Sequence, residues 1–258
     1  MSNSMPNEES TQADAPDARP PRPPWSAFKA ALADVGFHPS RRLGQNFLLD
    51  ENVVRAIAHA ADLRAGEPVL EVGPGCGFLS VHLAHSGAKL LAVEIDPRLA
   101  DVARSFLEPY SDVTLIECDV LAGKHKLAPE VEAALPADGE WQLVANLPYS
   151  ISGPLLALMA AREHPPRSMT VLVQLEVADR LVAEAGTRAW GPLSISVQSA
   201  YRGARVRTVG PQNFWPRPKV DSAVVRFERL DELPPLALRE RRVSLVARLF
   251  QRRRQALG

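Results

Sequence analysis

The chain has 258 residues with 30 basic and 30 acidic side chains, 23 prolines and two cysteines, Cys76 and Cys118. This length suits one large domain, or a large one plus a small one, in a globular protein rich in proline. It has no apolar stretch long enough to span a bilayer, no signal-peptide pattern and no Cys/His spacing suited to zinc, so we expect a cytoplasmic protein without a metal or a disulfide framework.

The neutral total hides an uneven charge distribution. Residues 202–258 carry 14 Lys/Arg and 5 Asp/Glu, a balance of +9, and the preceding residues carry 16 and 25, a balance of −9. A basic carboxyl-terminal part is typical both of a phosphate-binding surface and of a solvated helix face.

The chain begins with a segment that cannot support a core. Residues 1–24 are dominated by Pro, Ala, Asp, Glu and Ser, which predicts a disordered tail. A helix is expected from Trp25 to Phe37, ending near Gly36. The next segment, Arg41-Arg42-Leu43-Gly44-Gln45-Asn46-Phe47-Leu48, is compatible with a loop that closes over a ligand and with a polar linker.

A strand, a glycine loop and a helix then follow one another. After a helix capped by Asp50, residues 68–72 predict a buried strand that leads into Gly73-Pro74-Gly75-Cys76-Gly77 and a helix over 78–85. This order opens a Rossmann-like unit. The G-x-G-x-G spacing after an acid favours a nucleoside with a methionyl tail over a dinucleotide.

Two acidic residues follow the next two strands. The strand over 89–93 ends in Glu94, which is placed to accept hydrogen bonds from ribose hydroxyls. The strand over 113–117 precedes Asp119, a candidate partner for an adenine amino group. Charged residues often end strands, so neither acid is specific alone.

The central strand, 142–145, leads into Asn146-Leu147-Pro148-Tyr149. The Asn146 side-chain oxygen, a backbone carbonyl of the proline turn and the Tyr149 ring form a set that suits a planar amine. In isolation the tetrapeptide is also compatible with an ordinary strand-ending turn.

The remaining chain predicts a helix from Ser152, a strand over 169–175 and a helix over 176–185. Alternation over 193–197 suggests a strand. Strands over 205–209 and 222–227 flank a proline-rich loop with Phe214 and Trp215, which either serves the site or packs both rings into the core. A short amphipathic helix is expected over 248–254.

Together these segments resemble the KsgA (RsmA) family of ribosomal RNA adenine dimethyltransferases, from about residue 41 to the last residue. The resemblance rests on the motifs at 43–48, 71–77, 146–149, 176–181 and 214–224, and on Glu94 and Asp119. It implies an α/β fold: the Rossmann-like core of class I S-adenosylmethionine-dependent methyltransferases, with a seven-stranded mixed sheet, a reversed last strand and helices on both faces. It also makes 193–197 helical.

The resemblance implies roles for individual residues. The methionine end of S-adenosylmethionine is assigned to Asn46, Leu48 and Gly73, the ribose to Glu94, the adenine to Asp119, and both cofactor and target amine to Asn146; Gln45 and Gly75 join the cofactor-binding set. The family reaction dimethylates N6 of two adjacent adenines in the 3′-terminal hairpin loop of small-subunit ribosomal RNA, in an assembling 30S particle. We expect Asn146 and the Leu147 carbonyl to orient the amine at the Pro148 turn. Tyr149 and Phe214 are expected to stack the flipped base. We also expect the protein to be a monomer.

The sequence departs from the family pattern at Ser150, Gly153, Leu175 and Trp190. The expected domains are the tail at 1–24, a methyltransferase domain at 25–230, and at 231–258 the start of a helical RNA-binding domain that continues further in the family. Three rival interpretations stay open: a large-subunit methyltransferase of the antibiotic-resistance type, a DNA adenine methylase, and a ribosome-assembly factor whose binding matters more than its catalysis.

Overall fold

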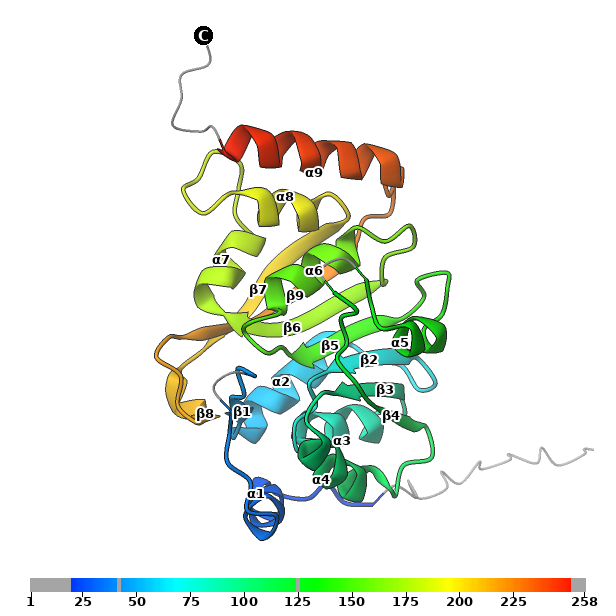
Figure 1. The fold of residues 1–258 in the computed structure, drawn as a ribbon, viewed down its shortest axis with the longest axis vertical. Coiled ribbons are helices and arrows are strands. Elements are labelled where there is room, and N and C mark those ends of the chain that lie inside the picture. The colour runs from blue at the N-terminus through cyan, green and yellow to red at the C-terminus, as the bar shows by residue number, and fades with distance from the viewer. Residues whose placement is uncertain (1–19, 41–42, 124–125, 252–258) are drawn as a thin grey trace, which may run out of the picture.

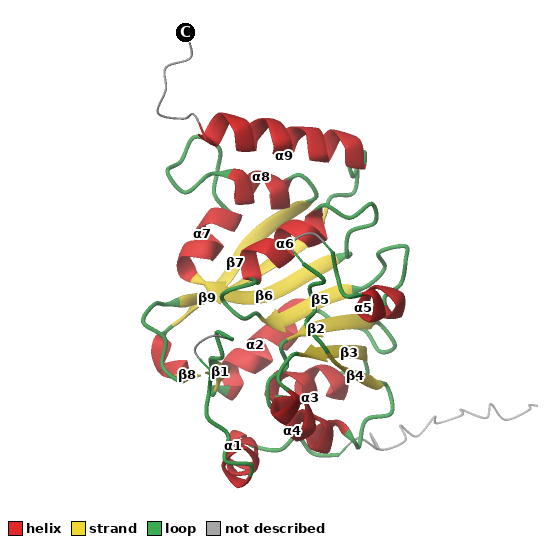
Figure 2. Cartoon of the chain, viewed as in Figure 1, coloured by secondary structure: helices red, strands yellow, loops and turns green. Residues whose placement is uncertain are grey.

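Short apolar runs form the central sheet of the molecule, whose strands are visible in Figures 1 and 2. The computed structural model describes residues 20–40, 43–123 and 126–251. The sheet contains seven strands: β2 (Pro68–Val72), β3 (Lys89–Glu94), β4 (Val113–Glu117), β5 (Gln142–Asn146), β6 (Ser168–Gln174), β7 (Tyr201–Val209) and β9 (Ser222–Arg229).

The strand order is β4-β3-β2-β5-β6-β9-β7, and β9 runs antiparallel to both of its neighbours. The predicted seven-stranded mixed sheet with a reversed last strand is thus confirmed. Because β2, β3, β4 and β5 pair in parallel, their carboxyl ends meet at one edge. In open α/β sheets, this is the edge where ligands bind.

Helices cover both faces of the sheet. They are α1 (Trp25–Asp34), α2 (Glu51–Ala61), α3 (Phe78–His85), α4 (Pro97–Leu107), α5 (Pro129–Ala134), α6 (Ser152–Ala160), α7 (Leu175–Leu181), α8 (Pro192–Gln198) and α9 (Leu236–Gln251), with a 3-10 turn, η1 (Pro211–Asn213). Alternation along β2 separates two cores: Val69 packs with α1–α4, and Leu70 packs with α5–α8.

A second, two-stranded ladder lies beside the main sheet. β1 (Phe47–Leu48) pairs antiparallel with β8 (Phe214–Trp215), so that Leu48 opposes Phe214. The Leu49 amide extends the ladder by donating to the Asn213 carbonyl at 2.8 Å. The ladder thereby joins two motifs that are distant in sequence, since the paired residues Leu48 and Phe214 are 166 positions apart.

Several helices differ from the sequence-based prediction. α1 ends at Asp34, because Gly36 adopts a left-handed conformation (φ +59°) and ends the helical path. The segment 193–197 lies in helix α8, as the family resemblance implied, so the strand that its alternation suggested is wrong.

The predicted helix 176–185 ends at Leu181 instead. Its last carbonyls accept hydrogen bonds from α8 side chains: Ser194 donates to Arg180 and Gln198 to Leu181. The predicted connection 122–140 contains α5.

The carboxyl-terminal helix α9 is longer than predicted and packs against α8 (Figure 1). Arg239, 2% exposed, ties it to the sheet-covering helices by donating to the carbonyls of Ala160, Arg162 (2.8 Å) and Pro234 (2.9 Å). The proposed second domain at 231–258 stays a prediction. Residues 252–258, with the end of the predicted amphipathic helix, and residues 1–19 of the predicted tail lie outside the described residues.

Within the described ranges, no helix combines the length and the apolarity needed to cross a membrane.

Candidate active site

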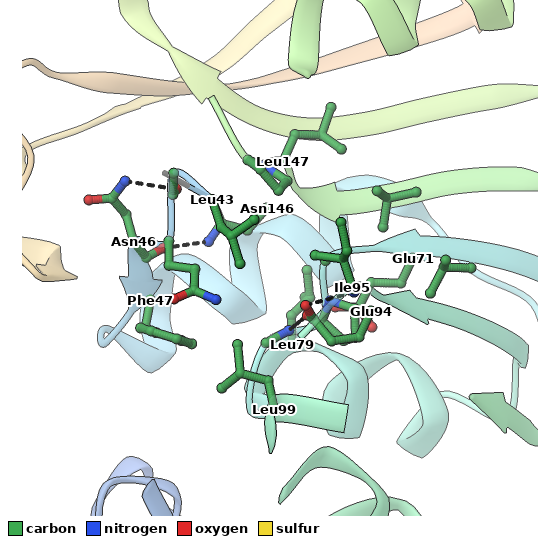
Figure 3. A pocket seen from close by; sticks show the side chains of 18 of the residues that line it. Leu43, Asn46, Phe47, Glu71, Leu79, Glu94, Ile95, Leu99, Asn146 and Leu147 are labelled. Atoms are coloured by element: carbon green, nitrogen blue, oxygen red, sulfur yellow. Dashed lines mark hydrogen bonds between the residues drawn. The ribbon is translucent and has the colours of Figure 1, made fainter. Parts of the chain in front are cut away.

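A cavity of about 220 Å³ opens where the carboxyl ends of β2, β3 and β5 meet (Figure 3). The structure brings together every predicted site residue except Phe214. Those that line the cavity are Gln45, Asn46, Leu48, Gly73, Gly75, Glu94, Asp119, Asn146, Leu147, Pro148 and Tyr149.

The glycine loop lets three segments approach closely. Gly73 and Gly75 have φ values of +68° and +60°, a region that disfavours side chains. A Cβ atom at Gly73 would lie 3.1 Å from the Pro148 ring, and one at Gly75 would lie 2.9 Å from the Phe47 ring. Two glycines therefore allow the Asn146–Tyr149 turn and the Gln45–Leu48 segment to close on one space.

Glu94 is held rigidly at the end of β3. Its side chain is 4% exposed and accepts the amides of Gly75, Ile95 and Asp96, each at 2.9 Å. Burial raises the pKa of this carboxyl, while the three amides act in the opposite direction. Because each carboxylate oxygen has two acceptor positions, the group keeps capacity for one further donor in the cavity.

Glu71, the acid before the glycine loop, lies deeper. It is 1% exposed, its Oε2 atom has no hydrogen-bond partner, and burial raises the pKa of the carboxyl to about 8. Figure 3 shows Glu71 beside Glu94, and the neighbouring charge acts in the same direction. The carboxyl is thus mostly protonated at neutral pH, and its Oε2 atom is without a partner at the back of the cavity.

The Asn146 amide has a defined orientation. Its Nδ2 donates to the Asn46 backbone carbonyl at 3.1 Å, as drawn in Figure 3. Asn46 is fixed in turn, because its own Nδ2 donates to the Gly44 carbonyl at 3.1 Å. With the Asn146 nitrogen engaged in this way, the side-chain oxygen is the acceptor that remains for a ligand.

Tyr149 is held in place by a residue of β9. Its hydroxyl shares a hydrogen bond of 2.8 Å with the hydroxyl of Ser222, which is fully buried at the start of β9. Burial raises the pKa of the Tyr149 phenol, so it stays neutral. This bond holds the half-buried ring in one orientation beside Asn146.

The segment before β1 is attached to the turn after β3. The Gln45 side chain accepts the Ser40 amide at 2.7 Å and donates to an Asp96 carboxylate oxygen at 3.2 Å. The guanidinium of Arg98, in the first turn of α4, lies over the Phe37 ring at 5.1 Å from its centroid. The cofactor-binding motif predicted at 43–48 is thus held over the cavity by side chains.

Phe214 is the exception among the predicted site residues. It is 3% exposed, belongs to the core beneath β1 and β8, and does not line the cavity. Its partner in the ladder, Leu48, does line it. The expectation that Phe214 faces the target base across the pocket therefore does not describe this structure.

Asp119 lies at the exposed end of the cavity. One of its oxygens, Oδ1, accepts the Leu121 amide at 2.9 Å. This bond fixes the turn after β4 and leaves Oδ2 available to a donor from the ligand.

Several apolar residues of the cavity were not predicted as site residues from the sequence, among them Trp25, Ile95 and Leu99. Ile95 is 46% exposed, which is unusual for isoleucine, and follows Glu94 directly. An apolar residue next to a strand-terminal acid is the signal that identifies it. Trp25 comes from α1, far away in sequence, and no local pattern indicates its position.

Thiol chemistry is not supported at this site. Burial raises the pKa of Cys76 to about 12 and that of Cys118 to about 11, so both cavity-lining thiols stay protonated. Across the described ranges, no cluster of three or more His, Cys, Asp or Glu side chains is suited to a metal ion.

Comparisons with known proteins agree with this geometry. A family model described as ribosomal RNA adenine dimethylase matches residues 36–258. The ribosomal RNA small subunit methyltransferase A of Lysinibacillus sphaericus (strain C3-41) is 38% identical over 227 residues, which span 88% of this chain and 77% of that protein.

Two solved structures are similar over most of the chain. The 23S rRNA methyltransferase ErmE has a TM-score of 0.64 and 31% identity, covering 80% of this chain and 79% of its own. A dimethyladenosine transferase from Plasmodium falciparum has a TM-score of 0.68 and 26% identity, covering 82% and 73%. With the family model matching most of its length, the chain belongs to the ribosomal RNA adenine dimethylase family.

Proposed function

We infer that this protein transfers methyl groups to N6 of two adjacent adenines in the 3′-terminal hairpin loop of small-subunit ribosomal RNA, giving N6,N6-dimethyladenosine. The observation that carries this inference is the family match over residues 36–258, together with 38% identity to a small-subunit methyltransferase. The assembling small subunit is the proposed partner.

The cavity suits S-adenosylmethionine as methyl donor. Glu94 is placed for the ribose hydroxyls and Asp119 for the adenine amino group, while Ile95 offers an apolar surface to the purine. The Oε2 atom of Glu71, which has no partner, provides a polar group at the inner wall, and the glycine loop leaves space that side chains would fill. When bound, this cofactor supplies an electrophilic methyl group.

Asn146 and Leu147 are proposed to activate the target amine. The exocyclic nitrogen of adenine is a poor nucleophile because its lone pair is delocalised into the ring. In the first transfer, the Asn146 oxygen and the Leu147 carbonyl accept hydrogen bonds from the two N–H groups, which favours a pyramidal nitrogen with its lone pair directed away from both acceptors. In the second transfer, the one remaining N–H group donates to one of them. As the amine gains positive charge, these acceptors bind the transition state more strongly than the ground state.

The target base must leave its stack to enter the site. Tyr149 provides the flat surface on which the flipped adenine lies, and its bond to Ser222 keeps the ring in place. Stacking on Phe214 requires β8 to shift, because that side chain is buried here. Pro148 fixes the turn, and water accepts the released proton.

The test is methylation of purified ribosomal subunits. Under-methylated small subunits and, in parallel, large subunits are incubated with methyl-labelled S-adenosylmethionine, and the labelled nucleotide is mapped. Dimethyladenosine at the two adjacent hairpin adenines is the expected result. Label only on large subunits would replace this proposal by the activity named for ErmE, which is 31% identical.

A further inference from the structure

The segment before the family match contributes to the wall of the cavity. The match begins at residue 36, whereas Trp25, the first residue of α1, lines the cavity together with Phe78, Leu79 and Leu99. Figure 1 shows α1 beside the helices that follow the glycine loop and β3. Residues 20–34, here called the N-terminal segment, thus reach the site from outside the matched region.

An aromatic cluster fixes the indole. The Trp25 and Phe78 ring centroids are 5.3 Å apart at 60°, and Phe78 is the first residue of α3, directly after the glycine loop. Phe28, fully buried one turn along α1, packs edge-on against Phe78 at 5.2 Å and stacks on Phe106 at 4.0 Å. Trp25 itself is only partly buried, so part of its ring is left for the cavity.

A second contact anchors the same segment on α3. The Arg22 guanidinium lies 2.8 Å from Nδ1 of His82, which is one helical turn beyond Phe78 and packs edge-on against its ring at 5.8 Å. Burial and the Arg22 charge lower the pKa of His82 to about 4, so a neutral imidazole accepts this bond. Arg22 and Trp25, which are separated by Pro23 and Pro24, therefore both contact α3.

We propose that Trp25 contacts the bound cofactor and that the N-terminal segment is part of the cofactor site. The proposal rests on the proposed function, because it takes S-adenosylmethionine as the occupant of the cavity. That ligand carries a purine and two cationic groups, and an indole face attracts both aromatic rings and cations.

The experiment compares binding and fluorescence in full-length variants. S-adenosylmethionine affinity is measured by calorimetry for the wild type, Trp25→Ala and Trp25→Phe, with Trp190→Phe as the matched control. Trp190 packs against Phe250 of α9, away from the cavity. We expect Kd to rise about fivefold in Trp25→Ala and less in Trp25→Phe.

Tryptophan emission gives a readout that folding alone does not move. Cofactor titration should change the emission of the wild type and of Trp190→Phe, and the change should be clearly smaller in Trp25→Phe. Any remainder comes from Trp215, whose ring centroid lies 5.7 Å from that of the cavity-lining Phe47. Arg22→Ala should keep the emission change and show a raised Kd.

A folded Trp25→Ala with a Kd within about twofold of wild type, together with an unchanged emission response in Trp25→Phe, would overturn this inference and leave the proposed function intact. Absence of cofactor binding by the wild type would instead overturn the proposed function, and this inference with it.

Discussion

At the scale of single residues, the proposed site depends on the Asn146 side-chain amide, whose nitrogen and oxygen have different roles. The Asn146 nitrogen is bound to the Asn46 carbonyl, and its oxygen is left for a ligand. The sequence identified both residues as candidates, but it did not indicate that one orients the other. Their separation of 100 positions explains why, since the contact exists only after the sheet has formed.

Replacement of Asn146 by alanine should reduce methyl transfer by about a hundredfold or more, because the transition state loses an oriented acceptor. Single-turnover transfer to small subunits, with cofactor binding measured separately, provides the check. Asn52→Ala, an exposed asparagine on α2, is the control and should behave as wild type. Wild-type transfer rates in Asn146→Ala would exclude the proposed mechanism.

The buried Glu71 makes stability depend on pH. Its pKa is raised from 4.5 to about 8 in the folded protein. The stabilisation that comes from the protonated carboxyl is fully present below pH 4.5 and is lost as pH rises through about 8.

Glu71→Gln should therefore gain stability relative to wild type between pH 5 and 8, by on the order of a few kcal/mol. Urea unfolding of both proteins across this range gives the difference. Glu108→Gln, on an exposed side chain after α4, should show no such trend. Parallel pH profiles for wild type and Glu71→Gln would contradict the assignment.

At the scale of elements, the glycine loop and its helix could be predicted nearly to the residue. α3 matches the expected range because glycine precedes it and Gly87 follows it closely. The seven residues of α8 were harder, because a helix of about two turns repeats its 3.6-residue period too few times to outweigh a local alternation. Pro192 and the bond from the Gly191 amide to Ser194 start it despite the alternation.

The close approach at Gly75 can be separated from its backbone conformation. Gly75→Ala adds a Cβ atom 2.9 Å from Phe47 at φ +60°, whereas Gly66→Ala meets nothing within 4 Å at φ +77°. We expect a loss of about 1 kcal/mol in unfolding free energy for Gly66→Ala and about 2–4 kcal/mol for Gly75→Ala.

Only Gly75→Ala should also weaken cofactor binding, because Phe47 must move to make room. Denaturant unfolding and calorimetry on both variants measure these effects. Equal losses in the two variants would show that the Phe47 contact is unimportant.

At the scale of the whole molecule, apolar periodicity predicted most of the strands, whereas the seven-stranded sheet and most of the cavity residues followed from the family resemblance. What it could not predict are contacts made by single side chains between distant elements. Trp25 in the cavity wall, Phe214 beneath the β1–β8 ladder and Arg239 between α9 and α6 are all of this kind.

Arg239→Ala should destabilise the protein by about 3 kcal/mol, because several buried carbonyls lose their donor at once. Arg241→Ala, two residues along α9 and exposed, should change stability by less than about 0.5 kcal/mol. Thermal and denaturant unfolding of the two variants provide the comparison. Similar stability would mean that α9 is attached by its apolar contacts alone.

The two-residue ladder between β1 and β8 has a consequence for the order of events at the site. It joins the segment that carries Asn46 and Leu48 to the loop that carries Phe214, so a displacement of one segment is transmitted to the other. We therefore expect cofactor binding at the first segment to change the affinity of the second, the proposed base-stacking loop, for RNA. Thermodynamic reciprocity requires RNA to change the affinity for the cofactor by the same factor.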